Sequence, residues 1–160
     1  MSSAAEGIAC ATAAAATGKP VWVSWTLHED HSGRLRSGET VAEAVAAMAG
    51  LPVAGYLANC CPPESITAAM AALTATGIPN HGGYANTFTP VPEDWTLDNA
   101  NPSGGLIGLR EDLDPDAYAT HAAAWIDAGA TVIGGCCGTR PAHIARLRAL
   151  IDARSADATA

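Results

Sequence analysis

The hydrophobic positions along the chain alternate between strand-like and helix-like patterns, with Gly or Pro at most junctions. Four segments predict buried strands, over residues 20–27, 53–59, 78–84 and 131–135. Each is followed by apolar residues at helical spacing, which predict helices over residues 40–49, 62–77, 114–129 and 139–151. An Ala-rich stretch at the start also looks helical. Alternating buried strands and helices indicate a parallel sheet in an α/β fold, whose ligand site is expected at the carboxyl ends of the strands.

Composition supports one folded domain, since 49% of the 160 residues are hydrophobic and only 15% are charged. Trp22, Trp25 and Trp125 are expected in the core. Cys10, in the Ala-rich start, is expected to be a small core residue. Residues 86–109 predict a long polar loop rich in Pro, Asn and Gly, and loops of this length are usually functional or disordered.

Charge and cysteine count narrow the classes of function. A net charge of −8 argues against a nucleic-acid partner, which calls for clustered Lys and Arg. The start of the chain does not resemble a signal peptide, and no apolar run approaches the ~20 residues of a membrane span, so no membrane partner is expected. Five cysteines without an export signal argue against a disulfide framework and favour a cytoplasmic location. Ligation, catalysis or packing remain as uses for cysteine.

Two cysteine pairs follow predicted strands. Cys60 and Cys61 come directly after the second strand, and Cys136 and Cys137 after the fourth, so both pairs are expected at one edge of the sheet. Adjacent cysteines are poor disulfide partners, because their Cα atoms lie about 3.8 Å apart and an unstrained bridge needs roughly 4.4 Å. Three thiolates with an open fourth position are typical of a catalytic zinc site. Ordinary buried packing is the alternative, and the spacing does not choose between Cys60 and Cys61.

The segments PVWVSWTL, GYLANCCPPESI, GGYANTF and VIGGCCGTRPAHI, in this order and spacing, resemble the homocysteine S-methyltransferase family. The resemblance covers nearly the whole chain and implies Zn²⁺ held by Cys60, Cys136 and Cys137. It also implies that Asn59 lies beside the metal and that Tyr84 and Asn86, a Tyr-x-Asn motif, line the substrate pocket. The implied reaction moves a methyl group from a sulfonium donor, S-methylmethionine or S-adenosylmethionine, to zinc-bound homocysteine, giving methionine.

Other polar residues are interpreted as structural. The cluster His28–Glu29–Asp30–His31 after the first strand suggests a metal site, but no confirming spacing follows, and a solvated loop is the preferred interpretation. Ser24 and Thr26 follow an S-x-T pattern like that of the family, and buried hydroxyls in packing explain them equally well. His81, His121 and His143 are expected to be structural or exposed.

The resemblance places the chain in one half of the family's fold. A full (β/α)8 TIM barrel typically needs ~250 residues, whereas this sequence supplies only the C-terminal half, the last four βα units. Residues 1–155 are expected to form a partial homocysteine-binding domain, and residues 156–160 a polar tail. Three explanations stay open: a truncated frame, a separately encoded N-terminal half, or a homodimer that completes the barrel.

Two hypotheses for function follow from this half-length resemblance. One is a zinc-dependent methyltransferase, and the other is a non-catalytic zinc-binding half-barrel remnant. A thiol redox protein is disfavoured, because neither cysteine pair has CxxC spacing.

Overall fold

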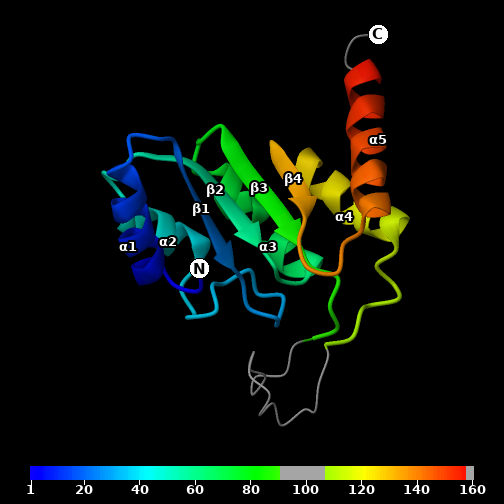
Figure 1. The fold of residues 1–160 in the computed structure, drawn as a ribbon, viewed down its shortest axis with the longest axis horizontal. Coiled ribbons are helices and arrows are strands. Elements are labelled where there is room, and N and C mark those ends of the chain that lie inside the picture. Colours follow the sequence, from blue (N-terminus) through cyan, green and yellow to red (C-terminus); the bar gives the residue numbers. More distant parts are fainter. Residues whose placement is uncertain (91–106, 158–160) are drawn as a thin grey trace.

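A computed structural model describes residues 1–90 and 107–157, and its centre is a four-stranded parallel sheet (Figure 1). The strands pair in sequence order, each parallel to the next: β1 (Val21–Thr26), β2 (Val53–Asn59), β3 (Asn80–Ala85) and β4 (Val132–Gly135). The helices of the described residues are α1 (Ala4–Ala15), α2 (Val41–Ala47), α3 (Pro63–Thr74), α4 (Pro115–Asp127) and α5 (Pro141–Asp157). The four predicted βα units are confirmed, with ends shifted by a few residues. Strand order without a crossover is the arrangement of a barrel segment, not of a doubly wound sheet.

Local sequence explains where the helices begin. Thr40 caps α2 in a capping box, in which its hydroxyl accepts from the backbone of Glu43 and the Glu43 side chain reaches back. Asp114 caps α4 through the Ala117 N–H, and Pro115 takes the first helical position, where a missing N–H costs nothing. These caps hold α2 and α4 at the points where the chain turns back along the sheet.

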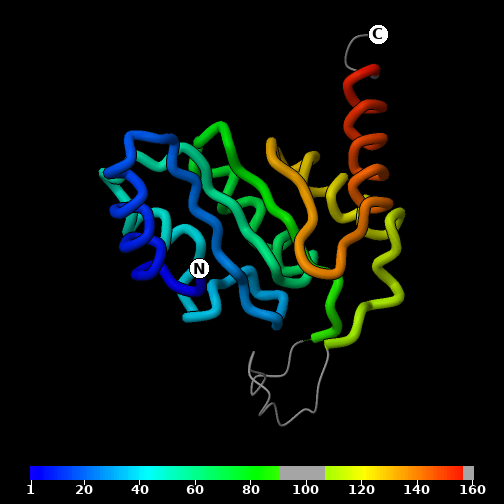
Figure 2. The backbone as a smooth tube through the Cα atoms, viewed as in Figure 1, coloured from blue at the N-terminus to red at the C-terminus, as the bar shows by residue number. Residues whose placement is uncertain are grey.

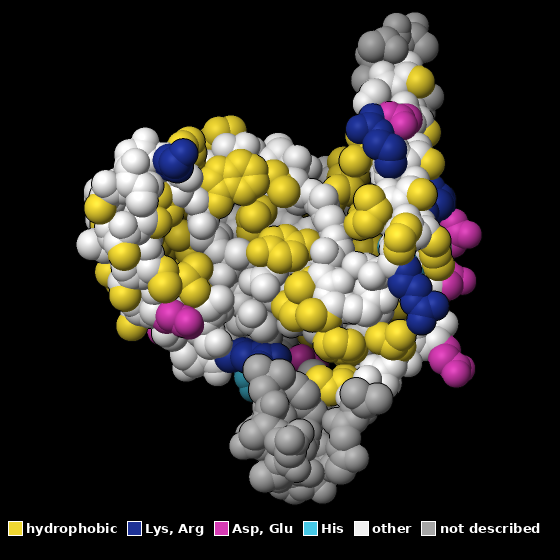
Figure 3. All heavy atoms as spheres, in the orientation of Figure 1, with side chains coloured by type: hydrophobic (Ala, Val, Ile, Leu, Met, Phe, Trp, Pro, Cys, Tyr) yellow, Lys and Arg dark blue, Asp and Glu magenta, His cyan; other side chains and the backbone are white. Residues whose placement is uncertain are grey.

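The helices cover one face of the sheet, and no helix of the described residues covers the other (Figures 1 and 3). Side chains alternate along β1, so Val23 and Trp25 are buried under the helices whereas Trp22 points to the opposite face. The prediction that Trp22 is a core residue is wrong: its side chain is 47% exposed and packs over Gly55 on the uncovered face. Trp25 and Trp125 are fully buried, as expected.

Cys10 also differs from its prediction. It lies exposed on α1 instead of in the core, because Ala4, Gly7 and Ala11 form the buried side of that helix. The exposed Cys10 thiol is therefore separated from the sheet by the helix that carries it.

Two predicted segments fall partly outside the described residues. Of the predicted polar loop, residues 91–106 lie outside them, and the flanking parts meet through a bridge between Phe88 and Leu109. Of the predicted tail, residues 158–160 lie outside, and α5 continues to Asp157, running past the end of the sheet (Figure 2). Within the described ranges, we find no helix with the length and apolar character needed to cross a membrane.

Candidate metal centre

Three thiols meet at the carboxyl ends of β2 and β4. The Sγ atom of Cys60 lies 3.6 Å from that of Cys137, and the Sγ atoms of Cys136 and Cys137 lie 3.9 Å apart. All three sulfurs are within 4.8 Å of one another, and they form the one such potential metal-ligand group found in the described residues. Strand order explains why the thiols meet. Only β3 lies between β2 and β4, and these parallel strands end at the same edge of the sheet.

The spacing of the sulfurs suits zinc. In a tetrahedral site with Zn–S bonds of ~2.3 Å, neighbouring sulfurs lie about 3.8 Å apart, close to the two distances observed here. Three thiolates are also the soft donor set that zinc prefers, and they leave one tetrahedral position for a further ligand. The cluster therefore fits a catalytic type of zinc site.

The backbone conformation at Cys60 directs the side chains of Cys60 and Cys61 to different places. Cys60 has φ of 49°, in the left-handed region that few residues other than glycine adopt. The turn leaves Cys60 half-buried in the triad, whereas Cys61 is fully buried in the hydrophobic core. Burial raises the pKa of the Cys61 thiol to about 12, so Cys61 is a neutral core residue at physiological pH.

The segment that leaves β3 is hydrogen-bonded to both cysteine turns. Toward β2, the Cys60 N–H donates to the Tyr84 carbonyl and the Asn86 N–H to the Cys61 carbonyl. Toward β4, the Cys136 N–H donates to the Ala85 carbonyl, and the N–H of residue 87 to the carbonyl of residue 137. The bonds thus alternate in direction along residues 84–87, with residues 84 and 86 bonded to the first cysteine turn and residues 85 and 87 to the second. This segment sets the spacing between Cys60 and the other two cysteines.

Small residues keep the second cysteine turn close to its neighbours. A Cβ atom at Gly135 would lie 2.5 Å from Thr139 Oγ1, whose hydroxyl donates to the Cys136 carbonyl at 2.7 Å. A Cβ atom at Gly138 would lie 2.3 Å from Thr87 Oγ1, and φ there is 79°. Gly135 and Gly138 therefore allow the second cysteine turn to pack closely against Thr139 and Thr87.

Electrostatics favour a cation at the triad. Burial raises the pKa of the Cys60 thiol, and the neighbouring Cys136 thiol adds to the increase. Burial also raises the pKa of Cys137, with a further contribution from Cys60. Because neighbouring thiolates repel each other, a bound metal cation would balance the negative charge of an ionised triad.

The residues expected to contact substrate differ in their surroundings. Asn59 and Tyr84 are half-buried at the ends of β2 and β3, and the Asn59 Oδ1 accepts from the Ser24 hydroxyl at 2.8 Å. Asn86 is only 2% exposed, and its Oδ1 accepts from the Phe88 N–H at 3.2 Å. Asn86 therefore shapes the chain after β3, whereas Asn59 and Tyr84 have side chains that solvent can reach.

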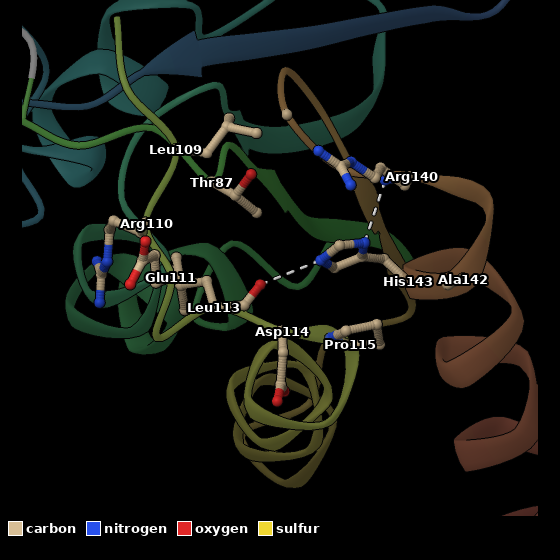
Figure 4. Close-up of a pocket in the computed structure, with 11 residues that line it drawn as sticks. Thr87, Leu109, Arg110, Glu111, Leu113, Asp114, Pro115, Arg140, Ala142 and His143 are labelled. Carbon is tan, nitrogen blue, oxygen red and sulfur yellow. Dashed lines mark hydrogen bonds between the residues drawn. The ribbon is translucent and has the colours of Figure 1, made fainter.

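A pocket of about 380 Å³ adjoins the turn that carries Cys137 (Figure 4). Gly138 and Thr87 line it, and the start of α5 forms one wall. There the His143 ring accepts from the Arg140 N–H at 3.1 Å and lies 3.1 Å from the Leu113 carbonyl. His143 is thus a buried structural residue, as the sequence suggested.

The histidine-rich loop after β1 is partly exposed, with 44% of the His28 side chain and 53% of that of Asp30 accessible. It takes no part in the metal-ligand group found in the described residues. His81 is buried in β3, and its Nδ1 lies 2.8 Å from the Ile78 carbonyl.

Residues 1–151 match the homocysteine S-methyltransferase family. The chain belongs to this family. The homocysteine S-methyltransferase of Escherichia coli (strain K12) is 33% identical to it over 135 residues, which are 80% of this chain and 38% of that enzyme. Methionine synthase of Mycobacterium leprae (strain TN) is 29% identical over 144 residues, which are 88% of this chain and 10% of that protein. The cysteine triad is consistent with the zinc site of homocysteine methyltransferases.

Solved structures of the family agree with the fold. The apo form of the homocysteine methyltransferase MmuM from Escherichia coli superposes with a TM-score of 0.66 at 30% identity, covering 92% of this chain and 46% of that one. Its oxidized form gives a TM-score of 0.67 at 29% identity, covering 94% and 43%. The four βα units thus match part of a TIM barrel, as the resemblance implied. The chain spans less than half the length of these relatives.

Sequence reasoning missed residues that hold the site from behind. Tyr118 falls within the helix predicted over residues 114–129, and its hydroxyl lies 2.8 Å from the Gly134 carbonyl and 3.2 Å from that of Ala85. Arg110, which adjoins the predicted loop, forms a two-bonded ion pair with Glu64 on α3. A tyrosine at a core position was the available signal, because a buried phenol usually finds a hydrogen-bond partner.

Proposed function

We propose that this chain is the zinc-binding half of a homocysteine S-methyltransferase. Cys60, Cys136 and Cys137 are its zinc ligands, and the reaction transfers a methyl group from a sulfonium donor to homocysteine. The observation that carries this proposal is the meeting of three thiols from two strand ends within 4.8 Å. Membership of the family supports the reaction class.

The triad supplies charge and geometry. When bound, zinc supplies the positive charge that ionises the three thiols and a substrate thiol at the fourth position. The chain's own contribution is to hold Cys60 and the Cys136–Cys137 pair at a fixed separation through the backbone of residues 84–87. Three anionic sulfurs leave the metal electron-rich, so that a fourth sulfur keeps its nucleophilicity.

Methyl transfer needs little acid or base from the protein. The homocysteine sulfur forms a bond to the methyl carbon while the bond from that carbon to the sulfonium sulfur breaks. The electron pair of the broken bond stays on the donor, which leaves as a neutral thioether, and the thiol proton passes to solvent. A neutral leaving group requires no protonation, so orientation is the main task left to the chain.

Asn59 and Tyr84 are the proposed substrate contacts. Because the Asn59 Oδ1 accepts from Ser24, its NH2 group remains to donate to an acceptor on the substrate. The Tyr84 hydroxyl can donate or accept beside it. Asn86 belongs to the same proposed set, with its NH2 group as the part that could reach a substrate, since its Oδ1 accepts from Phe88.

Metal content tests the ligand set. Wild type should bind one zinc, and the double variant Cys136→Ser with Cys137→Ser should bind none. Cys60→Ser should lose the metal and Cys61→Ser should keep it, while Cys10→Ser serves as a control for loss of an exposed thiol. Unchanged zinc in the double variant would rule out the proposed site.

Activity and mass test the rest of the proposal. Methionine formation from homocysteine and S-methylmethionine or S-adenosylmethionine, measured with the sedimentation mass, would separate the candidates. Turnover by a dimer supports a self-complementing enzyme, and turnover only after adding an N-terminal half supports a split one. A zinc-loaded chain inactive under both conditions favours a non-catalytic half barrel.

A further inference from the structure

The hydroxyl of Tyr118 lies where β3 and β4 end. It is 2.8 Å from the Gly134 carbonyl and 3.2 Å from the Ala85 carbonyl. The Ala85 carbonyl also accepts from the Cys136 N–H, and Gly134 stands two residues before that cysteine. One phenolic proton is therefore shared between the last carbonyl of β3 and the next-to-last carbonyl of β4, the two strands that lead into Asn86 and Cys136.

The phenol is held rigidly in this position. Tyr118 is fully buried, and its ring meets those of Trp125 and His143 edge to face, with centroids 6.2 and 5.7 Å away. His143 is itself fixed at the start of α5 by the backbone of Arg140 and Leu113. The ring contacts the helices before and after β4, and this packing leaves the hydroxyl no other direction in which to point.

We propose that Tyr118 is a positioning residue of the metal centre, whose hydroxyl sets the separation between Cys60 and the Cys136–Cys137 pair. This inference rests on the proposed zinc site.

The physical reason lies in the two carbonyls. Without the hydroxyl, the Gly134 carbonyl would lose the donor that Tyr118 supplies, and the Ala85 carbonyl would keep only the Cys136 N–H. The two oxygens would then repel each other in a dry environment. The ends of β3 and β4 would then move apart. Because β3 also holds Cys60 through the Tyr84 carbonyl, such a movement changes the distance from Cys60 to Cys136. Metal–ligand distances tolerate only about 0.2 Å, so a small shift weakens binding.

The test compares Tyr118→Phe with a matched variant in metal-binding assays. Thr67→Val removes the α3 hydroxyl that accepts from Trp125 Nε1 at 2.9 Å, and Trp125 lies on α4 like Tyr118 but outside the cysteine turns. Zinc affinity is measured by chelator competition on the full chain. The absorption spectrum of the Co²⁺-substituted protein reports the geometry of the thiolates, which a purely structural loss of stability would not change.

We expect Tyr118→Phe to weaken zinc binding about tenfold, the lower end of the range for residues behind metal ligands, and to shift the Co²⁺ spectrum. Thr67→Val should stay within about twofold of wild type, with an unchanged spectrum. Equal affinities in wild type and Tyr118→Phe, or equal losses in both variants, would overturn the inference while leaving the zinc site intact.

Two further outcomes are also decisive. A Tyr118→Phe chain that cannot fold would overturn the inference, since it would assign Tyr118 to folding as a whole. A wild type that binds no zinc would remove the metal centre and this inference together, and the proposed function would fail with them.

Discussion

Cys61 should make the metal-free protein lose stability in mild alkali. Its fully buried thiol has a pKa raised from 9.0 to about 12 because burial disfavours the thiolate. A thiol whose pKa is raised by folding contributes stability that is complete below its unfolded pKa and is lost as the pH rises toward the folded value. Over those three pH units, at about 1.4 kcal/mol each, the loss amounts to about 4 kcal/mol.

The first part of this loss is accessible to experiment. Between about pH 9 and pH 10, Cys61 accounts for a loss of about 1 kcal/mol in the free energy of unfolding. Cys60 and Cys137, whose pKa values are also raised, add a loss of stability that is common to all variants. Urea unfolding of wild type and Cys61→Ala, with chelator and reductant present, measures the difference. Cys10→Ala, which removes an exposed thiol, should retain the wild-type fall. If Cys61→Ala loses as much stability as wild type over this interval, burial does not raise the pKa of the Cys61 thiol and the prediction fails.

Three further predictions concern the packing, charge and metal of the site. Gly135→Ala should destabilise the chain by about 1–3 kcal/mol in urea unfolding, because its Cβ would displace Thr139, whereas Gly134→Ala, with 3.5 Å to its nearest neighbour, should change stability far less. Partial burial opposes ionisation of Glu64, but the bonds from Arg110 outweigh it and lower its pKa. Glu64→Gln should therefore lower the melting temperature at neutral pH, and this difference should shrink as the pH falls through the folded pKa of Glu64; a difference independent of pH would contradict it. Removal of zinc should lower stability by about 4 kcal/mol when free zinc is 1,000 times its Kd, measured by calorimetry with and without chelator, and unchanged unfolding would refute this prediction.

The fold was largely predictable because its local signals agree with one another. Thr40 and Asp114 occupy the cap positions that the sequence indicates, and Pro115 begins its helix. Trp22 shows the limit of this reasoning. An apolar run such as PVWVSWTL reads as buried on both sides, yet one face of the sheet is uncovered and leaves Trp22 47% exposed. Which face of a strand is covered depends on elements distant in sequence.

The candidate site was predictable in its ligand types but not in its construction. Two cysteine pairs at strand ends predict a shared metal, whereas the preference for Cys60 over Cys61 came from resemblance alone. The structure shows why Cys60 and not Cys61 joins the triad: the backbone at Cys60 is left-handed, which no sequence pattern here predicts. The hydrogen bonds of residues 84–87 and of Tyr118 depend on strand register, and they likewise became visible only in three dimensions.

The separation of the cysteines along the chain has a consequence for survival in the cell. Cys60 and Cys137 are 77 positions apart, so a metal that holds both closes a long loop of the chain. Closing a loop of this length removes roughly 4.5 kcal/mol of chain entropy from the unfolded ensemble. Opening of β2 away from β4 would require release of the ion. Metal supply would then govern how often proteases find an open chain, and the lifetime of the polypeptide would follow the availability of zinc.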